Sequence, residues 1–150
     1  MVASLFALLA LASCGPTIHS PTIDDVLNRN ADLKPDRSVD RDELVGEASW
    51  YGGSYNGRAT ANGETFDMGE FTAAHRTLPF NTVVRVVDKK TLKTVVVRIN
   101  DRGPFGKRHR IIDLSRAAAN DLNMIRRGKA QVVLEILVWG DGQTFHHARR

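Results

Sequence analysis

The chain has 150 residues, of which 42% are hydrophobic and 25% are charged, and its formal net charge at pH 7 is +4. These values are typical of one ordinary globular domain and exclude a disordered or fibrous chain. The single cysteine, Cys14, excludes an internal disulfide. A domain of about 100 residues can nevertheless fold on its hydrophobic core alone.

The first thirteen residues, MVASLFALLALAS, have the pattern of an export signal. Residues 5–12 are all apolar, which is the length of a signal-peptide core and too short to span a bilayer. The Leu-Ala-Ser-Cys run that ends at Cys14 resembles a bacterial lipobox. This resemblance implies that residues 1–13 are removed and that acyl chains on Cys14 anchor the mature protein to a membrane. A signal peptide in which Cys14 has no role is the alternative.

Residues 14–44 are predicted to form a flexible tether, because they contain three prolines and are rich in Asp, Asn and Arg. Residues 15–44 carry four basic against seven acidic side chains, whereas residues 45–139 carry fifteen against nine. A basic domain favours an anionic polymer as its partner. For an exported protein we expect peptidoglycan, with its peptide carboxylates, and no nucleic acid. A solvated basic surface without a partner is the other explanation.

The folded domain is predicted to cover residues 45–139, followed by a disordered tail over residues 140–150. Short segments that are rich in Val, Ile or aromatic residues and flanked by turn signals predict β-strands over residues 46–51, 82–87, 94–99 and 130–138. Residues 89–92 predict the loop of a hairpin between the second and third of these strands.

One helix is predicted over residues 115–124. Ser115 is a suitable N-cap, and Leu114, Ala118 and Leu122 fall on one helical face. Many short strands with a single short helix favour a small closed β-barrel.

Aromatic residues stand beside flexible backbone in residues 48–66, ASWYGGSYNGRATANGETF. Trp50, Tyr51 and Tyr55 suit the stacking of sugar rings, because the face of a pyranose is apolar at its C–H groups. For Trp50 an equally good interpretation is a core position of the first strand.

Asp101 lies where the strand VVVRI ends, between Arg98 and Arg102, and the turn pair Gly103-Pro104 follows at once. Strand ends often carry functional side chains, so Asp101 is a candidate acid or base. The alternative is an Asx-turn in which Asp101 only caps the loop. The two arginines would favour the ionised carboxylate, whereas a desolvated cleft would favour the protonated one.

Three further residues have weaker signals. A lone histidine such as His75 is more often structural than catalytic, and Asp113, close to the helix cap, suggests a local structural role. Glu64 is the other carboxylate that can share a cleft with Asp101. No tight ligand spacing of the HxH or HExxH type is present, so we expect no metal site, including one of His75 with Asp101 or His109, and no cofactor.

Five blocks carry a family resemblance: GEASWYG, NGRATANGETF, TAAHRTLPFNTVVRV, VVVRINDRGPF and RIIDLSRAAANDL. In this order, over about residues 45–138, they resemble the rare lipoprotein A (RlpA) family. The resemblance implies a mainly β fold, a six-stranded double-psi β-barrel with one or two short helices. It also implies a periplasmic lipoprotein with lytic transglycosylase activity on peptidoglycan glycan strands, preferably those stripped of stem peptides. Block by block, the site residues it implies are Asp101, His75 and Glu64.

This activity explains why one carboxyl can suffice. In a lytic transglycosylase no water attacks, because the C6 hydroxyl of the muramic acid closes a 1,6-anhydro ring on C1. We therefore expect Asp101 to be a general acid/base that protonates the leaving oxygen and takes the C6 proton. His75 would position or tune it, with Glu64 secondary. The residues expected to bind substrate are Trp50, Tyr51, Tyr55, Arg98 and Arg102.

Two functions without catalysis stay open: an expansin-like binder that loosens polysaccharide, and a structural lipoprotein that links the outer membrane to the wall. Gly15 follows Cys14, and resemblance to sorted lipoproteins then implies a lipid anchor in the outer membrane, facing the periplasm. No strand has a long exposed apolar edge, so we expect a monomer.

Overall fold

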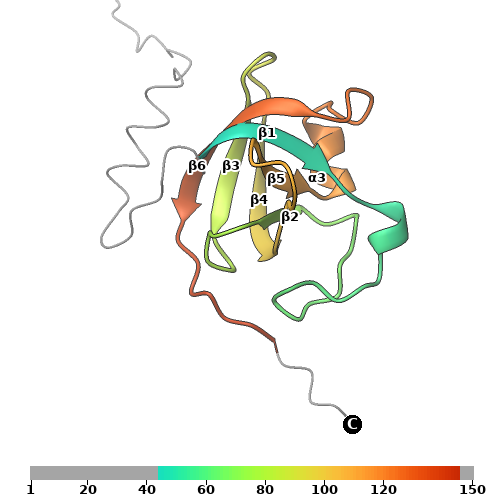
Figure 1. Cartoon of the computed structure of the whole chain (residues 1–150), viewed down its shortest axis with the longest axis vertical. Helices are drawn as coiled ribbons and strands as arrows, with labels where there is room; N and C mark the ends of the chain where they lie inside the picture. The colour runs from blue at the N-terminus through green and yellow to red at the C-terminus, as the bar shows by residue number, and fades with distance from the viewer. Residues whose placement is uncertain (1–43, 146–150) are drawn as a thin grey trace, which may run out of the picture.

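Six strands close into a barrel in the computed structural model, which describes residues 44–145 (Figure 1). Around the barrel the strands follow the order β1-β5-β2-β4-β3-β6. Neighbours run antiparallel except for the parallel pairs β1–β5 and β2–β4. The strands are β1 Val45–Trp50, β2 Thr72–His75, β3 Val83–Asp88, β4 Thr94–Asp101, β5 Arg110–Leu114 and β6 Ala130–Val138. The predicted six-stranded barrel is confirmed.

Alternating aliphatic side chains fill the inside of the barrel. In β4, Val95, Val97 and Ile99 are 4%, 1% and 0% exposed, and in β3, Val84 and Val86 are 0% exposed. A period of two is what places one face of each strand inward. The outward residues of the same strands are thereby free to carry polar contacts.

The four strands predicted from the sequence are present as β1, β3, β4 and β6, each within two residues of the predicted ends. The sequence pattern did not single out β2 and β5. All four residues of β2 are buried, so β2 shows no alternation. β5 is five residues long and leads directly into a helix cap.

The helix α3 spans Arg116–Asp121 and is shorter than predicted. Its predicted cap is confirmed, because the Ser115 side chain accepts a hydrogen bond from Ala118 N at 3.3 Å. The predicted inner face is also confirmed, since Leu114, Ala118 and Leu122 are all 0% exposed. A 3-10 turn, η1, covers Gly53–Tyr55.

Residues 140–145, in the predicted tail, donate hydrogen bonds from their backbone N–H groups to the rest of the domain. Their N–H donors are Gly140 to Thr82 Oγ1 (3.1 Å), Gly142 to Phe80 O (3.1 Å) and Phe145 to Asn62 O (2.6 Å). The predicted signal peptide, Cys14, the tether and residues 146–150 lie outside the described residues. Within residues 44–145 no helix has the length and apolar character needed to cross a membrane.

Candidate active site

A row of four residues crosses neighbouring strands β1, β5, β2 and β4 at one level. In the strand register Ser49 pairs with Asp113, Asp113 with Ala74, and Ala74 with Asp101. Paired residues on adjacent strands point to the same face of a sheet. Because adjacent strands lie about 4.8 Å apart, the Cα atoms of the two aspartates are roughly 10 Å apart. Ala74 is the residue between them in the strand register.

A β-bulge in β4 turns Asp101 to this face. Ala73 pairs with Ile99 and Ala74 with Asp101, so Asn100 is an extra residue in the ladder. A bulge of this kind reverses the alternation of side chains locally. Ile99 can therefore point into the core while Asp101, two residues later, lies at the surface of the site.

The row forms the floor of a groove made of two adjoining hollows, of about 370 Å³ and about 610 Å³. Both hollows are lined by Tyr51, Tyr55 and Asp113, so they adjoin each other. The smaller one also contains Asp101, and the others that line it are Ala74, Arg102, Gly103, Pro104 and Phe105. The larger is completed by Ser49, Trp50, Gly52, Gly53, Arg110 and Arg116.

Asp101 is half-buried and oriented by backbone. Its Oδ1 accepts hydrogen bonds from Ala61 N and from Arg102 N, both at 2.8 Å. The bound N–H is that of the next residue, Arg102, whereas the Asx-turn considered from the sequence would bind the N–H two residues on. The same carboxyl also lines the groove. Capping a loop and facing a substrate cleft are compatible here, because the two bonds occupy only one of the carboxyl oxygens.

The two arginines beside Asp101 in the sequence direct their guanidinium groups elsewhere. Arg102 lies over the ring of Phe80 at 3.7 Å and donates to the carbonyls of His75 and Leu78 at 3.2 and 3.0 Å. Arg98 pairs with Glu64. Neither guanidinium hydrogen-bonds Asp101, so the expected role of the two arginines at a substrate remains a prediction.

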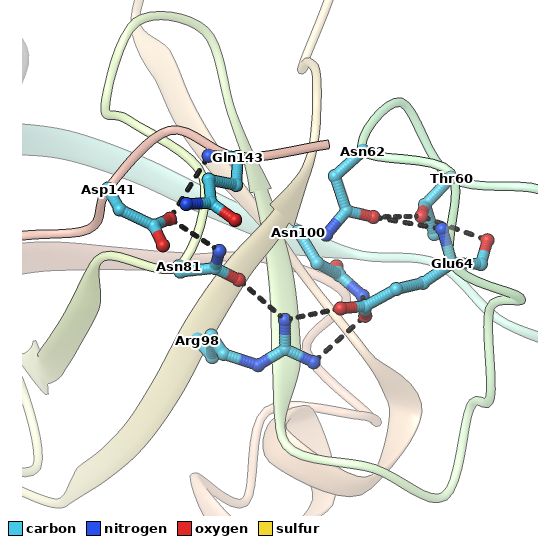
Figure 2. Close-up of polar contacts among 8 residues, drawn as sticks. All are labelled: Thr60, Asn62, Glu64, Asn81, Arg98, Asn100, Asp141 and Gln143. Carbon is cyan, nitrogen blue, oxygen red and sulfur yellow. Dashed lines mark hydrogen bonds and ion pairs between the residues drawn. The ribbon is translucent and has the colours of Figure 1, made fainter. Parts of the chain in front are cut away.

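Glu64 belongs to a polar network beside the groove (Figure 2). Arg98 donates a hydrogen bond to each of the two Glu64 carboxylate oxygens at 2.8 Å, and Asn100 Nδ2 donates to Glu64 Oε2 at 3.0 Å. The Arg98 hydrogen bonds are the main cause that lowers the pKa of Glu64 to about 2. Glu64 lines neither hollow. Glu64 is therefore an ionised carboxylate bound by Arg98 and Asn100, and its predicted catalytic role stays a prediction.

His75 is 2% exposed and begins a tight turn. Its Nδ1 accepts from Leu78 N at 3.1 Å and from Thr77 N at 3.3 Å, which assigns the proton of the neutral ring to Nε2. His75 does not line the groove, but its carbonyl binds Arg102, the residue after Asp101. This placement fits the expected positioning role of His75 without testing it.

Aromatic rings form one wall of the groove. The Tyr51 ring stacks on Phe66 at 4.4 Å and meets Tyr55 edge-on at 5.8 Å. Burial raises the pKa of Tyr51, and the nearby charges of Asp101 and Asp113 add to the effect. The hydroxyl of Tyr51 is buried without a hydrogen-bond partner in the described residues. Trp50 both lines the groove and packs against the core, so each of its two interpretations holds in part.

Asp113 and Phe105 are among the groove residues that sequence reasoning missed. Asp113 accepts a hydrogen bond from Ser49 Oγ and lies 3.8 Å from Arg110. Burial is the main cause that raises its pKa. A carboxylate inside the apolar run RIIDL was the available signal. Phe105, on the turn after Asp101, is 76% exposed, and nothing in the sequence distinguishes it from a loop residue.

The sequence profile of a family described as "Lytic transglycolase" matches residues 43–134. The chain belongs to this family. Among its relatives named "Endolytic peptidoglycan transglycosylase RlpA", one from Neisseria meningitidis serogroup B is 42% identical over 137 residues, which are 88% of this chain and 57% of the relative. Another, from Helicobacter pylori, is 52% identical over 99 residues, which are 66% of this chain and 31% of the relative. The chain thus spans about half or less of these RlpA proteins, and the predicted RlpA membership is confirmed.

Two solved structures share the fold. The Streptomyces papain inhibitor is 23% identical with a TM-score of 0.51, over 63% of this chain and 94% of the inhibitor. An expansin of Clavibacter michiganensis in complex with cellohexaose is 18% identical with a TM-score of 0.51. The match covers 63% of this chain and 50% of the expansin chain. At these identities the likeness concerns the fold alone, and it agrees with the predicted double-psi β-barrel.

Proposed function

We propose that this RlpA-family chain is an endolytic peptidoglycan lytic transglycosylase that leaves 1,6-anhydro-muramic acid ends. The observation that carries the proposal is the position of Asp101, an oriented carboxyl on the floor of an open groove, in a member of the lytic transglycolase family. The relatives whose printed name is endolytic peptidoglycan transglycosylase support the same substrate.

Asp101 is the group that exchanges protons with the substrate. Two backbone N–H groups hold Oδ1 before substrate arrives, so Oδ2 remains for the reaction. Preorganised geometry of this kind is what general acid–base catalysis needs. The C6 hydroxyl displaces the glycosidic oxygen from C1 within one sugar, so no water is consumed.

The walls of the groove suit a glycan strand. Tyr55 is 51% exposed and lies beside Tyr51 and Trp50 in the lining, which gives apolar surfaces for sugar faces. Arg102, Arg110 and Arg116 line the same groove and suit anionic groups such as the lactyl carboxylate of muramic acid freed of its peptide. A preference for stem-peptide-free strands follows as part of the proposal.

The test is mass spectrometry of the products after the full chain is incubated with peptidoglycan, both intact and stripped of stem peptides. Anhydro-muramyl ends made by wild type and lost in Asp101→Asn support the proposal, with Asp121→Asn, an exposed carboxylate on α3, as the matched control. Reducing ends would mean hydrolysis. Binding without any product would instead favour the expansin-like binder.

Anchoring through Cys14 to the outer membrane completes the proposal and rests on the lipobox resemblance. Cys14→Ser is expected to abolish labelling by radioactive palmitate and to move the protein from the membrane fraction to the soluble one. The reason is that the thiol to which the anchoring acyl chains are attached is lost. Cell fractionation and a density gradient that separates the two membranes measure this. Wild-type protein that takes up no label would rule the anchor out.

A further inference from the structure

We propose that Asp113 is a second catalytic carboxyl of this groove, the general acid that protonates the leaving glycosidic oxygen while Asp101 removes the proton of the attacking hydroxyl. The inference rests on the proposed function and deepens it, because it adds a catalytic residue and divides the two proton transfers between two groups.

The placement of the two carboxyls is the first argument. Asp101 and Asp113 flank Ala74 in the strand register, on one face, and both line the hollow of about 370 Å³. With Cα atoms roughly 10 Å apart, their carboxyl groups can stand on two sides of one glycosidic bond. Acid and base of glycoside-cleaving enzymes are separated by about 5–9.5 Å. Glu64, the other carboxylate considered, is outside the groove.

The surroundings of Asp113 suit a proton donor. Burial dominates and raises its pKa, which keeps a share of this carboxyl protonated at higher pH than an exposed one. The hydroxyl of Ser49 and two guanidinium groups act in the opposite direction. Two titratable groups in one site with different environments are the usual signature of an acid and its base. The charged or titratable groups that share the site with Asp113 are Arg76, Arg102, Arg110, Arg116, Asp101, Tyr51 and Tyr55.

The reaction balances without any co-reactant. The O6 proton passes to Asp101 as O6 forms a bond to C1. The bond between C1 and the glycosidic oxygen breaks, its electron pair goes to that oxygen, and Asp113 supplies the proton. Asp113 is then ionised and Asp101 protonated, and proton exchange with solvent in the open groove restores both.

The experiment compares two leaving groups on the full chain. With peptidoglycan strands, Asp113→Asn should lower kcat by about 10²–10⁴-fold with little change in KM, while Asp121→Asn is unaffected. With a muramoyl oligosaccharide that carries a 4-nitrophenoxide leaving group, which needs no protonation, Asp113→Asn should retain activity within about tenfold of wild type, and Asp101→Asn should not. Equal losses on both substrates would overturn the assignment of Asp113.

A second variant tests the same idea without removing the carboxyl. Ser49→Ala deletes a hydrogen bond that favours the ionised form, so the pKa of Asp113 should rise and the alkaline limb of the kcat profile should move to higher pH. If the alkaline limb of Ser49→Ala stays at the wild-type pH, the proposal is contradicted. This test remains valid if Asp113→Asn does not fold. Wild type without anhydro products defeats the proposed function itself, whereas an active wild type and a fully active Asp113→Asn defeat only this inference.

Discussion

Two side chains on the outer face of β4 take different roles. Arg98 pairs with Glu64, whereas the bulge at Asn100 brings Asp101 to that face and into the groove. Two residues separated by three positions thus serve different tasks. Arg98 also donates to Asn81 Oδ1 at 3.1 Å, and Asn81 donates to Asp141 at 2.8 Å, so the pair anchors a longer chain of contacts (Figure 2).

Glu64→Gln is predicted to destabilise the fold in a pH-dependent way. The pKa of Glu64 falls from 4.5 to about 2 in the folded state, so its ionised form stabilises the fold above about pH 4.5, and this contribution is lost as pH falls through 2. We expect a cost of about 1–2 kcal/mol near neutral pH, since both partners are partly exposed. Urea unfolding of both proteins over a pH series measures the gap, with Asp121→Asn as control. A gap that stays constant down to pH 2 would contradict the prediction.

Among the elements, the junction of β5 and α3 links stability to the site. Ser115 Oγ accepts from Ala118 N at 3.3 Å and donates to Glu70 O at 2.5 Å. The cap therefore fixes both the start of α3 and the end of β5, two residues after Asp113. A helix of only six residues depends on such tertiary contacts, because a short isolated helix is not stable in water.

Ser115→Ala is predicted to lower the free energy of unfolding by about 1–2 kcal/mol, because a buried helix cap and a second hydrogen bond are lost together. Ser115→Thr keeps an accepting hydroxyl and should retain most of the stability. Thermal unfolding followed by circular dichroism compares the three proteins. Equal losses in the two variants would show that packing around Ser115, and not the cap, determines its contribution.

At the scale of the whole molecule, segments distant in sequence hold the groove in place. The loop over residues 60–64 binds the end of β4 through Ala61 N to Asp101 Oδ1 and Asn62 N to Asn100 O. Residues 140–145 in turn lie on that loop, where Phe145 N donates to Asn62 O. The loop thus links residues 140–145 to the end of β4 and to the Asp101 carboxyl.

Gly63→Ala is predicted to disrupt the contact between the loop over residues 60–64 and residues 140–145. Gly63 has a φ of 93°, and a Cβ there would lie 1.9 Å from the carbonyl oxygen of Phe145. Gly57→Ala is the matched control, because Gly57 has a φ of 82° with nothing within 4 Å of an added Cβ. We expect about 1–2 kcal/mol of backbone strain in both variants and a further loss only in Gly63→Ala. Equal melting temperatures of Gly63→Ala and Gly57→Ala would contradict a stabilising contact between the loop and residues 140–145.

The sequence alone determined the features that depend on local pattern. Alternating Val and Ile in residues 94–99 predicted a strand with an inward face, and Ser115 predicted the start of a helix, because periodicity and capping act over a few residues. Five ordered blocks were enough for the family and, through it, for the barrel. Asp101 was a candidate because it ends a strand.

Only the tertiary structure decided which polar residues meet. The strand order β1-β5-β2-β4 brings Ser49, Asp113, Ala74 and Asp101 into one row, although Ser49 and Asp113 are 64 positions apart in the chain. Glu64 and the guanidinium of Arg98 pair with each other, and neither residue lines the groove. Register between distant strands is set by closure of the barrel and by bulges such as the one at Asn100, and neither leaves a signal in the local sequence.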